Sequence, residues 1–351
     1  MRARQVVITE PYRAEVREVE LPPPGPNQIL VETEVSAVSA GTELAVWTGT
    51  HQWLKDPALP DWKFPFRPGY SAAGTVVAVG SNITNVKPGD RVSYPGNHAS
   101  AELLTLGHER GRTWPLPAHL DFEKAAWACI ARYGMGAAIR AGITLGRSTA
   151  VFGLGIIGQF ALRTFLAAGA HPVVGIDGVR MRREAARAAG ADHVIDPGSP
   201  SSATGQGAGG AREQLHAYLG TRGAEVVADA TGIPAAVPAA LALACDGGQV
   251  VIVGSPRGKA HEVNFYDDLH RRYLEVTGAH GNMLFEPAHT RLAGAWDINK
   301  AQTWLLAQFA SSRLNLNGLV THRIAPAELS AAYEGLLNRK EEYLGVIVNW
   351  K

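Results

Sequence analysis

The sequence of 351 residues is poor in cysteine, with Cys129 and Cys245 as its only two. Two cysteines cannot form the disulfide framework of a small secreted protein, nor a four-cysteine zinc site within one chain. The sequence also lacks an apolar leader at its start and any run of eighteen uncharged apolar residues. We therefore expect no membrane association and a cytoplasmic location.

An excess of charge of one sign is also missing. The 33 Lys and Arg residues nearly balance the 32 Asp and Glu residues, and no basic run is interleaved with aromatic residues. Nucleic acid and acidic membrane surfaces are therefore not expected as principal partners. A hydrophobic content of 46% and a charged content of 19% are typical of a globular protein, and the length suffices for two domains.

The pattern of the sequence changes near residue 120. Before it, β-rich segments such as QILVETEVSAVS and AAGTVVAVGSNI alternate with turn residues, which predicts a small, strongly bent antiparallel sheet or barrel. After it, apolar strands such as TAVF and AEVVAD alternate with amphipathic helices. This pattern indicates an α/β domain with a parallel sheet covered on both faces. The Gly/Ser-rich residues 198–211 are typical of a flexible connection.

Two further stretches leave open questions. Residues 321–350 read as a helix followed by a strand, which we expect to return to the first domain. Residues 46–69 contain three tryptophans, two phenylalanines and four prolines. This composition fits a surface loop held by its own side chains, and it equally fits an aromatic wall beside a substrate.

The strongest functional signal is a glycine-rich turn between a buried strand and a helix. Gly153, Gly155 and Gly158 have the Gly-x-Gly-x-x-Gly spacing, with Ile156 and Ile157 between the last two glycines. The first glycine permits the tight turn, the second lets the backbone approach a pyrophosphate, and the third lets the helix pack closely on the strand. The pattern predicts a dinucleotide site at the helix N-terminus, although an ordinary strand–helix turn has similar composition.

An acidic residue strengthens this interpretation. Asp177 ends the next strand, nineteen residues after Gly158, where its carboxylate can accept hydrogen bonds from both ribose hydroxyls. A carboxylate there repels a 2′-phosphate, which favours NAD over NADP; the alternative is a helix cap. Arg182 could reach the same ribose or lie on a solvated helix face. Further cofactor contacts are expected where two later strands end, at Thr231, Gly232, Gly254 and Ser255.

With these motifs, the chain resembles the medium-chain dehydrogenase/reductase superfamily over nearly its whole length. The likeness rests on PGYSAAGTVVAVGSNITNVKPGDRV, on the nucleotide motif and on the C-terminal AYEGLLNRKEEYLGVIVNW. It implies a GroES-like, β-rich barrel domain formed by residues 1–128 and 283–351. It also implies an inserted Rossmann domain with a doubly wound parallel sheet in residues 129–282. Dimers, or tetramers, joined through the edges of the nucleotide sheets are expected.

The resemblance also implies that the catalytic zinc of many relatives is absent. Their Cys-Gly-Ser/Thr-Asp segment corresponds here to Ala40-Gly41-Thr42-Glu43, and their Gly-His-Glu segment to Gly69-Tyr70-Ser71. Cys129 aligns best with the third ligand. Because catalytic zinc needs three protein ligands from Cys, His or carboxylate, one cysteine cannot hold it. SAGTELAVWTG with PGYSAAG is most similar to a zinc-lacking branch related to bacteriochlorophyllide dehydrogenases and bi-domain oxidoreductases.

Without zinc, other groups must manage the hydroxyl proton and the alkoxide charge. The resemblance directs Tyr70 toward the reacting carbon, with Glu43 behind it and Thr42 near the substrate oxygen. His98 is the rival acid/base, because histidine titrates near neutral pH. For each of these residues a purely structural role is the alternative: Tyr70 could fill the vacated metal cavity, Glu43 could be a buried hydrogen-bond acceptor, and His98 could hold its loop.

These observations favour an NAD(H)-linked, zinc-independent oxidoreductase that interconverts a secondary alcohol and a ketone. The expected small-molecule substrate is a sugar, a cyclitol or a bulky secondary metabolite. The alternatives are an NAD(P)H-dependent ene or quinone reductase, and a protein that binds a dinucleotide without turnover. Fold alone does not decide between them, because one fold supports many functions.

Overall fold

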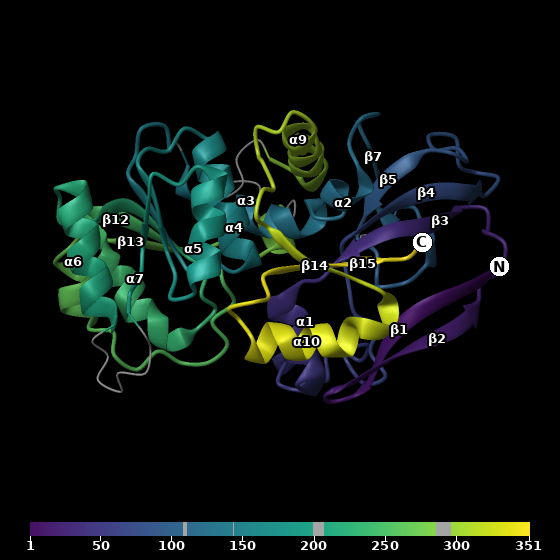
Figure 1. The fold of residues 1–351 in the computed structure, drawn as a ribbon, viewed down its shortest axis with the longest axis horizontal. Coiled ribbons are helices and arrows are strands. Elements are labelled where there is room, and N and C mark those ends of the chain that lie inside the picture. The colour runs from purple at the N-terminus through teal and green to yellow at the C-terminus, as the bar shows by residue number, and fades with distance from the viewer. Residues whose placement is uncertain (108–110, 143, 199–206, 286–295) are drawn as a thin grey trace. The chain divides into compact units, whose positions relative to one another are not determined.

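The structure, a computed structural model, describes residues 1–107, 111–142, 144–198, 207–285 and 296–351. The chain forms two compact units (Figure 1). The first contains Met1–Ile130, Gln302–Ser311 and Val320–Lys351, and the second contains Ala131–Ala301 and Ser312–Leu319. Each unit has its own hydrophobic core, as the change of sequence pattern near residue 120 predicts.

The first unit is built on a bent, mostly antiparallel sheet whose central strand is β3 (Gln28–Ala37). The first half of β3 pairs with β6 and its second half with β15, while β4 runs along the other side. One strand thus changes partners along its length, and the sheet bends as the sequence predicts. The other strands of this sheet are β4 (Ala72–Val79), β5 (Arg91–Tyr94), β6 (Ala101–Thr105), β7 (Trp114–Pro115), β14 (Val320–Ile324) and β15 (Gly345–Asn349). Strands β1 (Arg2–Glu10) and β2 (Arg13–Glu20) pair with each other in a separate two-stranded sheet.

The C-terminal segment completes the first unit. Strand β15 pairs with β3 through Ile347 and Val348, and helix α10 (Leu329–Asn338) lies beside α1 (Ala40–Trp47) in Figure 1. Their shared core joins residues from both ends of the chain, among them Ile8 and Tyr333, both with no exposed surface. The expectation that the final helix and strand return to the first domain is therefore confirmed.

The second unit contains a parallel sheet in the order β10-β9-β8-β11-β12-β13. Alternate residues of a strand face opposite sides. Val151 packs with helices α3 (Ala128–Ala141) and α4 (Ile156–Ala167), whereas Ala150 packs with α6 (Gly207–Leu219) and α7 (Val237–Leu243). Both faces are therefore covered, which explains why these strands are apolar throughout. The strands are β8 (Thr149–Phe152), β9 (Val173–Ile176), β10 (His193–Ile195), β11 (Ala224–Asp229), β12 (Ala244–Ile252) and β13 (Glu275–Gly278).

The helices alternate with these strands. No helix in the described parts of the chain has the length and apolar character that a membrane crossing needs. The Gly/Ser-rich stretch is in part helical, because α6 begins at Gly207; residues 199–206 lie outside the described residues. The other two long helices that the structure describes are α5 (Arg180–Ala189) and α9 (Ile298–Ala310).

The shorter helical segments connect these elements. They are η1 (Gln52–Lys55), α2 (Phe122–Ala125), η3 (Pro234–Ala236), η4 (Phe265–His270), η5 (Asn282–Phe285) and η7 (Pro326–Glu328).

The unit boundaries differ from those expected at residues 128 and 283. The chain re-enters the first unit at Gln302, and Ser312–Leu319 belongs to the second unit. One cause is Arg163 on α4, whose guanidinium donates to the carbonyl oxygens of Asn315 (2.7 Å) and Asn317 (2.8 Å). These bonds attach the segment to α4.

Strand β13 forms one edge of the parallel sheet. Its residue Val276 is 39% exposed, and Tyr273 just before it is 84% exposed. The expected dimer through this edge stays a prediction.

Replacing Arg163 with Met should destabilise the second unit. Arg163 is 2% exposed, and its loss removes the donors of two partly buried carbonyl oxygens and of the buried Gln159 side-chain oxygen. We expect the free energy of unfolding to fall by about 2–4 kcal/mol in urea titrations. The matched control is Arg187→Met on the exposed face of α5, where a change within about 0.5 kcal/mol is expected. Equal stabilities of the two variants would contradict the role given to Arg163.

Candidate active site

The glycine-rich turn joins β8 to α4 in the second unit. Gly153 has φ of +88°, a conformation that favours glycine, and a Cβ there would lie 2.8 Å from the Thr231 nitrogen. At Gly158 a Cβ would lie 1.8 Å from the Gly153 oxygen, so the helix can approach the strand only without a side chain. At Gly155, by contrast, a Cβ would meet nothing within 4 Å. The fold itself thus requires the outer glycines, and the middle one faces open space that a pyrophosphate can occupy.

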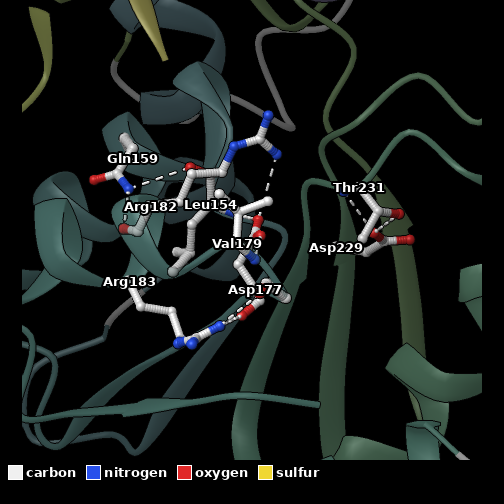
Figure 2. Close-up of polar contacts among 9 residues, drawn as sticks. Leu154, Gln159, Asp177, Val179, Arg182, Arg183, Asp229 and Thr231 are labelled. Carbon is white, nitrogen blue, oxygen red and sulfur yellow. Dashed lines mark hydrogen bonds and ion pairs between the residues drawn. The ribbon is translucent and has the colours of Figure 1, made fainter. Parts of the chain in front are cut away.

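Asp177 directly follows β9 and holds the glycine-rich turn in place (Figure 2). One carboxylate oxygen accepts from the Leu154 N–H at 2.8 Å, and the other accepts from the Val179 N–H at 2.8 Å. Arg182 forms an ion pair with the same carboxylate at 3.6 Å. Asp177 is not the N-cap of α5, which is Val179. The predicted ribose ligand therefore also fixes the backbone of the turn.

Arg182 lies at the same place and is only partly satisfied. Its Nε atom is buried and has no hydrogen-bond partner among the described residues. Because a buried polar hydrogen without an acceptor is costly, this atom fits a ligand oxygen supplied from outside the chain. The neighbouring Arg183 instead donates to the Asp177 and Gly178 carbonyl oxygens and so anchors the start of α5.

The predicted contacts on later strands gather near the glycine-rich turn. Gly254 approaches Gly232 so closely that a Cβ on it would lie 2.4 Å from the Gly232 nitrogen, and Gly232 in turn lies against the Ser255 backbone. Thr231 donates its hydroxyl hydrogen to Asp229 at 2.6 Å and its N–H at 2.9 Å. Burial raises the pKa of Asp229, and these two bonds oppose that rise. Asp229 was not predicted, although it too is a polar residue that ends a buried strand.

In the first unit, Tyr70 follows a turn that only glycine permits. Gly69 has φ of +97°, and a Cβ there would lie 2.7 Å from the backbone nitrogen of His98. The Tyr70 side chain is partly exposed, and its hydroxyl forms a hydrogen bond with the Ser39 hydroxyl. Ser39 is the N-cap of α1, yet its side chain does not cap the helix. The Ser39 hydroxyl therefore bonds to Tyr70 and not to the N-terminus of the helix.

Glu43 lies in the first turn of α1 and is 2% exposed. One carboxylate oxygen accepts from the Ser39 N–H at 2.7 Å. The other accepts from the Tyr333 hydroxyl at 2.6 Å and lies 2.9 Å from His98 Nε2. Burial alone would raise the pKa of Glu43, but the electrostatic attraction of His98 and the hydrogen bonds from His98, Tyr333 and the Ser39 N–H together lower it. Burial and the adjacent carboxylate raise the pKa of Tyr333 well above its usual value.

The hydrogen bonds around His98 define a consistent tautomer. Trp350 Nε1 can only donate, and it lies 2.9 Å from the Ser36 hydroxyl oxygen. Ser36 then donates its own hydrogen to His98 Nδ1 at 2.8 Å, which leaves Nε2–H to donate to the Glu43 carboxylate. All donors in this chain of bonds are thereby used. We call Ser36, Ser39, Glu43, His98, Tyr333 and Trp350 the Glu43 network.

The structure alters two expectations about these residues. Glu43 does not act directly behind the Tyr70 hydroxyl; Ser39 connects the two, with its N–H on Glu43 and its hydroxyl on Tyr70. His98 has no exposed surface and both ring nitrogens are bonded, so a substrate cannot reach it as a direct acid/base must. His98 therefore supports Glu43. Thr42 is half-buried in the same turn, and its contact with a substrate oxygen stays a prediction.

Sequence patterns did not reveal Ser39, Ser36, Tyr333 or Trp350. A serine at the start of a helix is a usual cap, so nothing in the pattern distinguished Ser39. Tyr333 lies 290 residues from Glu43 along the chain, and only the return of α10 brings them together.

The residues at the zinc positions do not fit that metal. Ala40 and Tyr70 cannot supply the two missing ligands, and Cys129 is fully buried, where it accepts from the Gln302 amide. In the parts of the chain that the structure describes, no group of three or more His, Cys, Asp or Glu could hold a metal ion.

The aromatic residues between 46 and 69 pack on one another. His51, which is 4% exposed, stacks on Trp62 with ring centres 4.6 Å apart. Trp53 and Phe66 contact the same tryptophan, at 4.7 Å and 5.1 Å. This arrangement fits a loop held together by its own side chains.

Breaking the Glu43 network should cost stability in a pH-dependent way. Because the pKa of Glu43 is lowered in the folded chain, its stabilising effect is present above the unfolded value of about 4.5 and is lost as pH falls through the lower folded value. We expect Glu43→Gln to lower the free energy of unfolding by about 2–3 kcal/mol at pH 7. The difference should shrink near pH 4, as urea titrations at both pH values would measure. Exposed Glu334→Gln is the control; a loss independent of pH would contradict the argument.

Comparisons with known proteins agree with this geometry. The chain is 27% identical to 2-desacetyl-2-hydroxyethyl bacteriochlorophyllide A dehydrogenase of Cereibacter sphaeroides, across 100% of this chain and 99% of the relative. It is 26% identical to sorbitol dehydrogenase of Ovis aries, across 94% and 92%. A solved Escherichia coli oxidoreductase of unknown specificity shares the fold, with a TM-score of 0.80, 21% identity and 99% of each chain covered.

Family models match the two parts of the chain separately. The model described as an alcohol dehydrogenase GroES-like domain matches residues 25–127, and the one described as a zinc-binding dehydrogenase matches residues 157–296. The second range does not include Ala40 or Tyr70, so its name carries no information about those positions. Together with relatives that align along nearly the whole chain, the two models show that this protein belongs to the medium-chain dehydrogenase/reductase superfamily.

Proposed function

We propose that this member of the superfamily is an NAD(H)-dependent oxidoreductase that interconverts a secondary alcohol and a ketone without zinc. The observation that carries the proposal is the Tyr70 hydroxyl, held by Ser39 at a position where zinc-dependent relatives have a metal ligand. The relatives named for sorbitol and for a hydroxyethyl bacteriochlorophyllide support a hydroxyl on a polyol or a bulky molecule as the substrate.

The second unit offers the groups that would hold the cofactor. The open backbone at Gly155 suits a pyrophosphate. The Asp177 carboxylate suits a ribose, together with the Arg182 Nε–H, which has no acceptor among the described residues. Arg182 offsets part of the Asp177 charge, but two N–H donors keep that carboxylate at the end of β9, which favours NAD over NADP. When bound, NAD⁺ supplies an acceptor for the hydride that leaves the hydroxyl-bearing carbon.

The first unit would handle the proton. A phenol both donates and accepts, so Tyr70 can hold the substrate oxygen and exchange its proton while the Ser39 hydroxyl keeps it in place. Ser39 keeps its position because its backbone N–H donates a hydrogen bond to the buried Glu43 carboxylate. Glu43 and His98 act here as positioning residues.

The first test measures NADH formed from NAD⁺ and a panel of polyols, cyclitols and bulky secondary alcohols. A strong chelator is present throughout, and the metal content of the protein is measured in parallel. We expect turnover that the chelator does not reduce, and a Kd for NADH at least about tenfold below that for NADPH, because a carboxylate repels the 2′-phosphate.

Other outcomes would contradict the proposal in distinct ways. Loss of turnover in chelator would show that a metal is needed. NADPH-dependent reduction of enones or quinones, without alcohol oxidation, would indicate an ene reductase. NADH binding without any turnover would indicate a dinucleotide-binding protein.

Removing the Tyr70 hydroxyl tests the proton step. For Tyr70→Phe we expect kcat to fall by about 10²–10⁴-fold, the usual contribution of a positioned acid/base, with little change in the Kd for NADH. Ser39→Ala, which frees the phenol, should lower kcat less and leave KM nearly unchanged. Full turnover by Tyr70→Phe would remove Tyr70 from the mechanism.

A further inference from the structure

A polar hollow lies in the second unit at the amino ends of its strands. Arg222 lies just before β11, Asp246 is near the start of β12, and Arg272 lies just before β13. The cavity has a volume of about 290 Å³ and is lined by Arg212, Arg222, Asp246, Asp267, Arg271 and Arg272. The glycine-rich turn and Asp177 follow the carboxyl ends of their strands. This hollow therefore lies at the opposite ends of the strands from the candidate nucleotide site.

The charges of the hollow do not balance. Asp246 pairs with Arg272 at 3.0 Å, and Asp267 pairs with Arg271 at 3.2 Å. Arg212 and Arg222 have no ion pair or hydrogen bond with another described residue. Since arginine stays protonated at any ordinary pH, these two leave an excess of two positive charges around a small space.

Arg272 is used differently from the other arginines. Its guanidinium donates to the Leu241 oxygen at 2.9 Å and to the Ala244 oxygen, both at the end of α7. It is therefore a fixed wall of the hollow. Arg212 on α6 and Arg222 in the following turn are exposed, and their guanidinium groups remain available.

A neighbouring histidine senses this charge. Burial lowers the pKa of His216, and the charges of Arg212, Arg272 and Arg222 lower it further. Its Nε2 atom is buried without a hydrogen-bond partner among the described residues. The positive potential thus extends into α6.

We propose that this hollow binds the dianionic phosphoryl group of a small molecule, with Arg212 and Arg222 as its ligands. A phosphate monoester carries a charge of about −1.5 to −2 at neutral pH, which matches the two arginines that have no ion pair with a described residue. The planar guanidinium presents two parallel N–H groups that match phosphate oxygens, so two arginines can hold one phosphate from two sides. The volume is at the lower end of small-molecule sites, and the balanced net charge of the whole chain does not suit an extended polyanion.

The test titrates the full chain with inorganic phosphate and with glycerol phosphate, at constant ionic strength in chloride. Calorimetry gives the Kd, and NMR follows the pKa of the His216 ring, whose signals are assigned with a His216→Gln variant. We expect saturable binding and a rise in the His216 pKa, because a bound dianion offsets the arginine charges. Tighter binding of glycerol phosphate would identify a monoester as the ligand; equal binding would identify free phosphate.

Variants separate this site from any phosphate binding at the glycine-rich turn. Arg212→Ala/Arg222→Ala should weaken binding at least about tenfold and abolish the His216 response, since each charge-assisted hydrogen bond has an effect of that size. Arg222→Lys keeps the charge but loses the planar guanidinium, so we expect a loss of phosphate affinity between that of the native chain and that of the double variant. The control, Arg2→Ala/Arg13→Ala, removes two exposed arginines of the first unit. Unchanged affinity in the double variant, or an unmoved His216 pKa at saturation, would overturn the proposal.

Discussion

The arrangement of the first unit depends on one buried charge. A carboxylate inside a protein costs several kcal/mol unless donors surround it, and Glu43 is 2% exposed. Its donors come from the start of α1, from the loop before β6 and from α10. These segments are separated by 4, 55 and 290 residues from Glu43, so the charge is satisfied only when both ends of the chain have folded together. The Tyr70 hydroxyl takes its position from the same network, through Ser39.

The second unit depends on close approach of backbones instead of charge. At Gly153 and Gly158 neighbouring backbone atoms lie so near that no side chain fits. Such contacts leave N–H groups at the start of α4 pointing outward, where an anion can accept them. Asp177 extends this arrangement by binding the Leu154 N–H, so the same carboxylate that suits a ribose also maintains the turn.

Local patterns explain why much of this could be predicted from the sequence. The glycine spacing and the continuously apolar strands are visible within short windows, and they indicated the nucleotide motif and the parallel sheet. The residues at Ala40 and Tyr70 are equally local, and they led to the expectation that zinc is absent. The Glu43 network was not visible. Its bonds between Glu43 and Tyr333, and between Ser36 and Trp350, join residues about 300 positions apart, and a single sequence gives no signal for such pairs. Likewise, His98 resembled an acid/base by residue type, and its residue type gave no sign that the side chain is fully buried.

The carboxyl ends and the amino ends of the parallel strands must recognise anions by different means. Helices begin at the carboxyl ends of the strands, and their free N–H groups and partial positive charge attract a pyrophosphate without any charged side chain. Helices end at the amino ends of the strands, and their last carbonyl oxygens carry a partial negative charge that repels an anion. Arg272 neutralises this effect at the end of α7 by donating to its last carbonyl groups. A positive charge that attracts phosphate at this place needs additional arginines, and Arg212 and Arg222 supply it.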